Sequence, residues 1–327
     1  MSVDSILNTL QVKTEQFLTW RKRRKYIRKE LQKRKNPILD WIEAFLWAAC
    51  VVLLINQYLL QAYQIPSSSM EDTLLVSDRI FVNKFIYGPE LLPGMFKLPS
   101  PVEPHRGEII IFENPTYISQ GPLFDIAQRI IYMLTLSLVD IDRNPDGTPK
   151  AHFLIKRAVG MGGDRLRIED GDMFFMPQGT DIWLPESEFQ EVSGVEYPVK
   201  RLVQESAYPV IREAGRLTAL SDMEIELSAQ AENALSRFQT IRYPDHFAFN
   251  RARTAELFAA NPHKRRFSSY WRKYERGWYI PEGNIFAMGD NRDNSRDARW
   301  FGAIESDAVL GRAMFRYWPL HRVGGIE

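Results

Sequence analysis

The chain changes from an apolar, membrane-length segment to a globular sequence at Gln64-Ile65-Pro66-Ser67-Ser68-Ser69-Met70. Consecutive serines after a proline are typical of a turn. A serine hydroxyl becomes an effective nucleophile only when a base lies within hydrogen-bond reach. A distant segment, Phe153-Leu154-Ile155-Lys156-Arg157-Ala158-Val159-Gly160, contains a candidate base in Lys156. A serine and a lysine that folding brings together can make a hydrolase without histidine.

Lys156 can act as a base only when its amine is neutral. An unperturbed lysine has a pKa of about 10.4 and holds its proton at neutral pH. Burial disfavours the charged form and can lower the pKa by roughly 3–5 units. The apolar residues on both sides of Lys156 favour a buried strand. A lysine at an exposed strand edge is the alternative.

The overall composition is that of an ordinary folded protein. The 327 residues suffice for one large or two modest domains. Apolar residues make up 45% and charged residues 25%, and the formal net charge is +1. This balance gives no general attraction to nucleic acid, so we predict no nucleic-acid partner. The single cysteine, Cys50, excludes an intrachain disulfide and leaves the redox compartment open.

Positive charge is concentrated near the N-terminus. Residues 1–20 have the spacing of a short amphipathic helix, and between Arg21 and Lys35 there are ten basic residues against one acid, Glu30. Such a run can bind nucleic acid or form a solvated helix face. Because an apolar segment follows, we favour a role in membrane topology and in contact with anionic lipid. We therefore predict that residues 1–37 form a cytoplasmic basic segment.

Residues 38–63 are predicted to form a single transmembrane helix. Their centre, residues 44–55, is continuously apolar, and polar residues lie towards the ends. A bilayer requires about 20 predominantly apolar residues. Under the positive-inside rule the N-terminus stays in the cytoplasm, and the chain after Gln64 lies outside the cytoplasm. A buried helix of a soluble protein is the alternative. A removable signal peptide is disfavoured by the long basic region.

The rest of the chain reads mainly as short strands separated by glycine turns. This pattern predicts a fold that is mainly β with some α, with a β-rich body at residues 64–170 and 280–327. The predicted strands share β-branched and aromatic residues, and they lie at 79–86, 108–112, 153–159, 165–169, 284–288 and 309–318.

Two insertions interrupt this body. Residues 114–150 contain an apolar, helix-periodic stretch at 126–141, which suits a packed or membrane-lying helix better than a second, short transmembrane span. Residues 171–279 are polar and mixed, and we predict that they form an inserted subdomain. Within it, the capping-box spacing of residues 221–224 predicts a helix from Ser221 to about Phe238.

A polar segment at residues 289–299 follows one predicted strand. Its alternating Asn291, Asp293, Ser295 and Asp297 are similar to a calcium loop, but Arg296 stands where an EF-hand needs glycine. A self-bonded polar turn is the simpler interpretation. The five histidines form no zinc pattern, so no metal site is predicted. A Ser-His-Asp triad remains open, without a local signature.

Together these segments resemble the type I signal peptidase family, membrane-anchored serine–lysine endopeptidases that remove signal peptides from exported preproteins. The resemblance rests on four motifs in the family's order. They lie at residues 65–70 with Thr73-Leu74, at 106–108, at 155–160 and at 289–297. The insertions and the first 36 residues are not covered.

The resemblance implies a role for each matched residue. Ser69 would be the nucleophile and Lys156 the general base. Ser67 would complete an oxyanion hole, and Ser295 would hydrogen-bond to Lys156 and orient it. Ile65 and Ile155 would line the pockets for small substrate residues. The residues that would support the site are Arg157, Asp290, Asp297 and Arg299. Neither a metal nor an organic cofactor is implied.

The chain departs from the family's pattern at four positions. Asp72 and Gly162 stand where proline is common, Ala298 replaces a common serine, and Glu108 replaces a frequent aspartate. None of these changes removes a proposed catalytic group, but Asp72 leaves the rigidity of the loop after Ser69 open.

The resemblance implies exported preproteins and the lipid bilayer as partners. It places the protein in the inner (cytoplasmic) membrane. Two other functions remain open from the sequence: a related membrane serine–lysine protease with a different client, and a non-catalytic, membrane-tethered binding module.

Overall fold

The computed structural model describes residues 3–34, 36–92, 95–145, 147–148 and 150–326. The chain divides into two compact units, and the division falls after Val52. The side chains of residues 1–11, 28–35 and 92–95 lie outside the described part. Side chains of the amphipathic helix predicted at residues 1–20, and those at the end of the basic run, therefore fall partly outside it.

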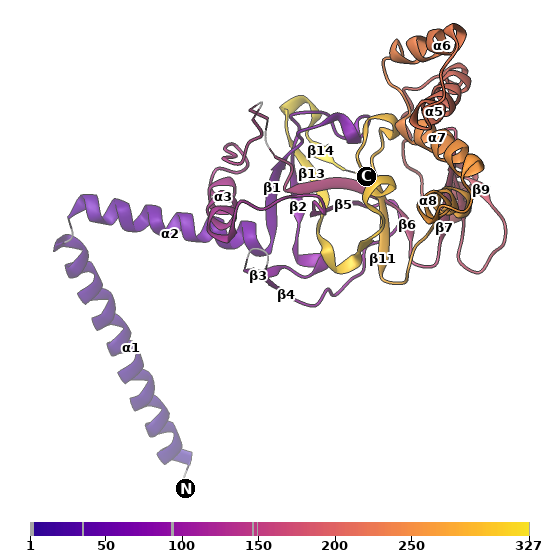
Figure 1. The fold of residues 1–327 in the computed structure, drawn as a ribbon. Helices are drawn as coiled ribbons and strands as arrows, with labels where there is room; N and C mark the ends of the chain where they lie inside the picture. The colour runs from indigo at the N-terminus through magenta and orange to yellow at the C-terminus, as the bar shows by residue number, and fades with distance from the viewer. Residues whose placement is uncertain (1–2, 35, 93–94, 146, 149, 327) are drawn as a thin grey trace. The chain divides into compact units, whose positions relative to one another are not determined.

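The first helix, α1, spans Val3–Arg34 (Figure 1). It is longer than the predicted helix at residues 1–20. The basic run continues the helix because lysine and arginine are good helix formers and no proline or glycine occurs before Pro37.

The membrane-length helix, α2, spans Pro37–Tyr58. Its mean hydropathy reaches 2.2, and no other helix in the described part of the chain is long and apolar enough to cross a membrane. Its 22 residues span about 33 Å, close to the thickness of a bilayer's hydrocarbon core. The helix ends five residues before the predicted boundary at 63, because residues 60–64 form a strand that pairs with Arg79–Asn83.

The body is built on an antiparallel eight-stranded sheet of order β1-β2-β13-β5-β6-β11-β12, with β14 paired to β13. This sheet confirms the predicted mainly β class. Its strands are β1 Leu60–Gln64, β2 Arg79–Asn83, β5 Ile109–Glu113, β6 Phe153–Met161, β11 Asn284–Met288, β12 Ile304–Glu305, β13 Val309–Trp318 and β14 Gly324–Gly325.

Two smaller sheets flank the main one. The first has the order β10-β7-β8-β9, and the second is the hairpin β3–β4. Their strands are β3 Glu90–Leu92, β4 Met95–Lys97, β7 Arg165–Glu169, β8 Asp172–Met176, β9 Leu184–Pro185 and β10 Trp278–Tyr279. The pairing of β7 with β8 crosses the predicted start of the inserted subdomain at 171.

Strand β6 lies inside the main sheet, between β5 and β11. Residues 155–160 of this strand are all buried, as expected for a strand covered on both faces. Lys156 is opposite Ile110 of β5, and Arg157 is opposite Ile109. The apolar strand that made Lys156 a candidate base therefore places it within the core.

Helix α3 of the first insertion spans Pro122–Leu134. It begins earlier than predicted, with proline in its first turn, and ends before Leu136 and Ser137, which have positive φ angles. At 13 residues it is too short to span a bilayer. Tyr132 packs against Tyr63 of β1, with ring centroids 6.1 Å apart.

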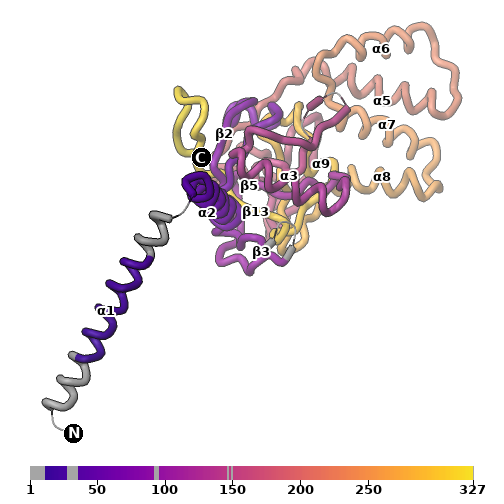
Figure 2. Tube along the Cα trace, turned by 90° about the vertical axis from the view of Figure 1, so that its left-hand side faces the viewer, coloured from indigo at the N-terminus to yellow at the C-terminus, as the bar shows by residue number. Residues whose placement is uncertain are grey.

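The second insertion is mostly helical. Figures 1 and 2 show α5 to α8 grouped at one end of the body, and Figure 1 shows α3 at the other end. The remaining helices are α4 Glu186–Ser193, α5 Tyr208–Asp222, α6 Ala229–Gln239, α7 His246–Ala260, α8 Arg265–Arg276 and α9 Ala298–Phe301.

The predicted helix start at Ser221 is wrong, because Ser221 and Asp222 end α5. Glu224 has a φ of +61°, which interrupts the helical backbone. The next helix begins at Ala229, where the Ser228 hydroxyl accepts a hydrogen bond from the Ala231 backbone N–H.

Candidate active site

The structure brings Ser69 and Lys156 into direct contact. The Lys156 Nζ lies 2.7 Å from the Ser69 Oγ, although 87 residues separate them in the chain. Ser69 sits in the 3-10 turn Ser68–Met70. Met70 and Leu74 are buried in the core, and their packing holds the turn against the body. This turn lies beside strand β6, and its fixed position keeps the Ser69 hydroxyl in contact with the Lys156 amine.

Burial increases the fraction of Lys156 side chains that are neutral at neutral pH and can therefore act as a base. The residue is 3% exposed. Burial lowers its pKa to about 8, against the opposing effect of the Asp297 and Asp290 carboxylates. The Nζ also donates a hydrogen bond to the Ile155 carbonyl, at 3.0 Å. About a tenth of the amines with this pKa are neutral at pH 7.

Ser67 lies beside the proposed nucleophile. Its hydroxyl donates to the Ser69 Oγ at 3.4 Å, and its side chain is exposed. Ser67 precedes the 3-10 turn in an extended conformation, with φ −139° and ψ 162°. A hydroxyl in this position can turn towards a carbonyl oxygen under attack at Ser69.

Arg157 and Asp290 form a buried ion pair behind the site. The Arg157 Nε and a second guanidinium nitrogen each donate to the Asp290 carboxylate at 2.8 Å. Thr73 donates to the same carboxylate at 2.6 Å. The pair links β6, the segment after Ser69 and the loop after β11. Sequence reasoning did not single out Thr73, although it lies in the quoted nucleophile motif.

A second ion pair fixes the loop that contains Ser295. Arg299 donates to Asp297 at 2.8 Å and 2.9 Å, and the Gly289 backbone N–H donates to Asp297 at 3.1 Å. Burial favours a raised pKa for Asp297, but the ion pair and hydrogen bonds with Arg299, together with the hydrogen bond from the Gly289 N–H, hold the pKa below its ordinary value.

Ser295 is close to the site but does not bond to Lys156 as predicted. Its hydroxyl is buried, and among the described residues it has no well-formed hydrogen bond. Gly289 separates it from Ser69: a Cβ at position 289 would lie 2.4 Å from both the Ser295 Oγ and the Ser69 carbonyl. The close approach of these two segments therefore requires a glycine at 289.

Lys200, from the second insertion, ties three parts of the site together. Its backbone N–H donates to the Asp290 carbonyl, and its carbonyl accepts from the Arg292 N–H. Its amine lies 2.9 Å from Asp72 and 3.5 Å from Glu71. Asp72 has a φ of +86°, which proline cannot adopt. Where the family commonly has proline, this chain has Asp72, and the salt bridges of Lys200 support the turn instead.

Ile65 and Ile155 lie next to the pair and are both nearly buried. They line one side of a cavity of about 340 Å³, which also reaches β1 and α3. The two residues predicted to contact substrate are thus brought together beside the nucleophile.

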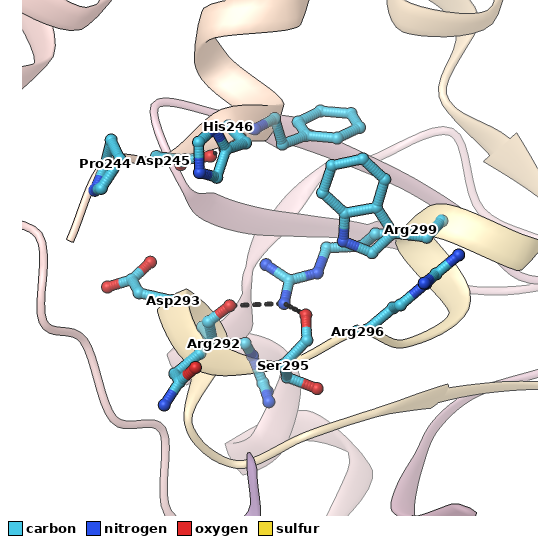
Figure 3. Close-up of a pocket in the computed structure, with 11 residues that line it drawn as sticks. Pro244, Asp245, His246, Arg292, Asp293, Ser295, Arg296 and Arg299 are labelled. Atoms are coloured by element: carbon cyan, nitrogen blue, oxygen red, sulfur yellow. Dashed lines mark hydrogen bonds between the residues drawn. The ribbon is translucent and has the colours of Figure 1, made fainter. Parts of the chain in front are cut away.

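Figure 3 shows a second pocket, on the loop that contains Ser295. This pocket of about 440 Å³ is bordered by the start of α7 at Asp245 and His246 and by Trp300. The Arg299 guanidinium donates to the backbone carbonyl of Arg292 and lies 3.5 Å from that of Ser295. Arg292 is itself buried and pairs with Glu186 at 2.5 Å. The pair between Arg292 and Glu186 was not predicted from the sequence, because Glu186 lies in the insertion.

This arrangement can carry out acyl transfer. A serine hydroxyl in contact with a buried amine of lowered pKa has a nucleophile and a base at hydrogen-bond distance. The neighbouring Ser67 hydroxyl adds a donor for a developing oxyanion. The two buried ion pairs fix the surrounding loops.

Comparisons with known proteins agree with this chemistry. A family model described as signal peptidase, peptidase S26, matches residues 38–207 and 228–318. Signal peptidase I of Haemophilus influenzae is 27% identical over 289 residues, covering 86% of this chain and 70% of its own length. Signal peptidase I of Aquifex aeolicus is 27% identical over 287 residues, covering 85% and 82%. That of Pseudomonas aeruginosa is 26% identical over 299 residues, covering 87% and 75%.

Replacing Lys156 by methionine is expected to raise stability at neutral pH. The amine has a pKa of about 8 in the folded chain and an ordinary value of 10.5. Below pH 8 the charged, buried amine costs the fold about 3 kcal/mol, and this cost disappears as the pH rises through 10.5. The melting temperature of Lys156→Met should exceed that of the wild type at pH 6.5, and the difference should shrink at pH 9.5. A difference that does not change with pH would contradict the lowered pKa.

Proposed function

We propose that Ser69 and Lys156 are the catalytic dyad of a membrane-anchored endopeptidase, because the chain belongs to the signal peptidase family, peptidase S26. The relatives are signal peptidases, and the chain removes signal peptides from preproteins. The observation that supports the dyad is the 2.7 Å contact between the Lys156 Nζ and the Ser69 Oγ.

The reaction begins when neutral Lys156 accepts the Ser69 proton as the Ser69 Oγ attacks the scissile carbonyl. The tetrahedral intermediate collapses to an ester on Ser69, and Lys156 gives the proton that it accepted from Ser69 to the leaving amine. A water molecule then attacks the ester while Lys156 accepts its proton, which returns to Ser69 as the acid product leaves. One amine serves both half-reactions, as a histidine does in other serine hydrolases.

The oxyanion formed in both half-reactions is stabilised by the Ser67 hydroxyl and the Ser69 backbone N–H. Removing one donor of this kind typically lowers the rate by roughly 10²–10³-fold. Ser295 has a supporting role: packed against Gly289, it keeps the final loop in contact with the Ser69 carbonyl. Arg157, Asp290, Asp297 and Arg299 act through the loops that they fix.

The substrate binds as an extended segment that pairs with an exposed strand edge. Small residues before the cleaved bond contact Ile65 and Ile155. The α2 helix holds the enzyme in the membrane, where the substrate's own apolar signal segment is also held, and this shared location raises the effective substrate concentration. We place α1 in the cytoplasm and the body on the outer side of the inner membrane.

Changing Ser69 to alanine should abolish cleavage of a preprotein by the detergent-solubilised chain. The substitution removes the nucleophilic oxygen but no buried apolar contact, so the melting temperature should stay near that of the wild type. Ser236→Ala, at an exposed serine of α6, is the matched control and should cleave normally. Substantial cleavage by Ser69→Ala would refute the dyad. It would leave a different nucleophile to be found.

Activity should rise with pH as Lys156 loses its proton. Its pKa is about 8, so kcat/KM should increase about tenfold per pH unit below 7 and level off above about 9. The profile is measured with one preprotein between pH 5.5 and 10. A rate that stays constant down to pH 5.5 would contradict a lysine base.

The proposed topology can be tested with single cysteines in a Cys50→Ser background. Lys13→Cys lies in α1, and Asp181→Cys lies in an exposed part of the body. A membrane-impermeant maleimide added to intact spheroplasts should label position 181 and should label position 13 only after lysis. The opposite pattern would reverse the assigned orientation.

A further inference from the structure

Helix α3 of the first insertion is amphipathic in the reverse sense from an ordinary surface helix. A helix at the surface of a folded protein normally turns its apolar side to the core and its polar side to water. In α3 every exposed residue is apolar. We call the four large ones the apolar stripe, and they are Leu123, Ile126, Ile130 and Leu134. At about 3.6 residues per turn, these positions lie on one side of the helix.

The polar side chains of α3 are bonded within the protein instead. Arg129 pairs with Glu113 at 2.5 Å and with Glu90 at 3.5 Å. The Gln128 amide is buried and donates to Asp140 at 2.8 Å. The polar side of the helix therefore faces the body, and the apolar stripe is the side that faces outward.

The apolar surface extends beyond the helix in both directions along the chain. Leu123 of the stripe is 84% exposed, and exposed apolar residues flank α3 at Ile118, Leu136, Leu138 and Val139. Single exposed apolar side chains are common, but a group of this size marks contact with another protein or with a membrane. The surroundings of α3 decide between these two partners.

Strand β3 holds α3 next to the end of the membrane-length helix. The last turn of α2, from Leu53 on, belongs to the same compact unit as the body. Its Gln57 side chain donates to the Glu90 carbonyl at 2.9 Å, and the Tyr58 hydroxyl donates to the Leu91 carbonyl at 2.8 Å. The Glu90 carboxylate in turn pairs with Arg129 of α3. The end of α2 and α3 are thus fixed to the same short strand.

This position favours the bilayer as the partner. The apolar part of α2 ends where the hydrocarbon core ends, so a helix held beside that end lies at the membrane surface. Helices that lie in the interface bury an apolar face about 5–10 Å into the boundary between headgroups and acyl chains. They need not be long enough to cross the bilayer, so the 13 residues of α3 suffice.

We propose that the apolar stripe of α3 lies in the leaflet at which α2 ends, against the acyl chains of the lipid. The inference rests on the membrane anchorage that is part of the proposed function. It gives the protein a second lipid contact, made by the insertion at residues 114–150. Tyr132 of the same helix accepts a hydrogen bond from the Gln64 N–H at 3.3 Å, so this contact also holds the segment that leads to Ser69 close to the membrane.

The test measures lipid contact at position 123 of the full chain in phosphatidylcholine vesicles. Leu123→Cys, in a Cys50→Ser background, carries an NBD fluorophore, whose emission should be blue-shifted. A nitroxide near the carboxyl end of the lipid acyl chain should quench it more than one near the methyl end, because an interfacial helix lies only about 5–10 Å deep. Gln239→Cys, at an exposed glutamine of α6, is the matched control and should emit as in water.

Glutamates on the stripe should weaken this contact. Ile126→Glu combined with Ile130→Glu should lower the quenching at position 123, because a charged side chain is unfavourable in hydrocarbon. Both isoleucines are exposed, so the melting temperature in detergent should stay near that of the parent chain. Ile182→Glu, at a 66% exposed isoleucine before β9, should leave the quenching unchanged.

Equal emission and equal quenching at positions 123 and 239 would show that the stripe faces water, and would overturn the proposal. Shielded emission at position 123 without quenching by the lipid would indicate a protein partner, such as a second copy of this chain, and would also overturn it. Cleavage of a preprotein by the wild type in the same vesicles is measured separately. Its failure would refute the proposed function, whereas the quenching would still decide the lipid contact.

Discussion

The active site depends on the burial of one amine. Lys156 lies on an interior strand of the main sheet, and water is largely excluded from it. That burial lowers its pKa to about 8 and so provides a neutral base without a histidine. The same burial is unfavourable for folding, since a charged amine loses its hydration. Sites of this kind keep a group in an unfavourable state because the reaction needs it there.

The carboxylates near Lys156 limit how far its pKa falls. Asp290 and Asp297 both favour the charged amine, and either one alone beside a buried lysine would work against catalysis. Each is instead paired with its own arginine, Arg157 or Arg299. Both arginines fix their loops, and Arg299 also opposes the negative charge that Lys156 would otherwise meet. Their position explains why charged residues can surround a site that needs a neutral base.

The sequence predicted the parts of this protein that depend on local patterns. Strands β7, β11 and β13 have the predicted bounds, because alternation and glycine turns determine them. The pairing of Ser69 with Lys156 could be predicted only through the resemblance, since no local pattern relates residues 87 positions apart. Element ends were less predictable: α2 stops early because residues 60–64 pair with β2.

Contacts made by the insertions were not predictable at all. The capping-box spacing at Ser221 fits a helix start, but tertiary packing makes these residues the end of α5. The bonds of Lys200 depend on how segments distant in sequence pack. The predicted hydrogen bond from Ser295 to Lys156 is likewise not formed, because it depends on the packing of two segments that are distant in sequence. The Ser295 hydroxyl is directed at the narrow space around Gly289.

The place of Lys200 has a consequence for anyone who wishes to shorten this enzyme. The second insertion looks dispensable, as a helical addition to a complete β body. Yet its backbone is hydrogen-bonded to both Asp290 and Arg292, and its amine forms salt bridges with Glu71 and Asp72 in the turn that follows the nucleophile. A shortened enzyme would therefore have to retain the short segment around residue 200, even if the four helices α5 to α8 that follow it were deleted.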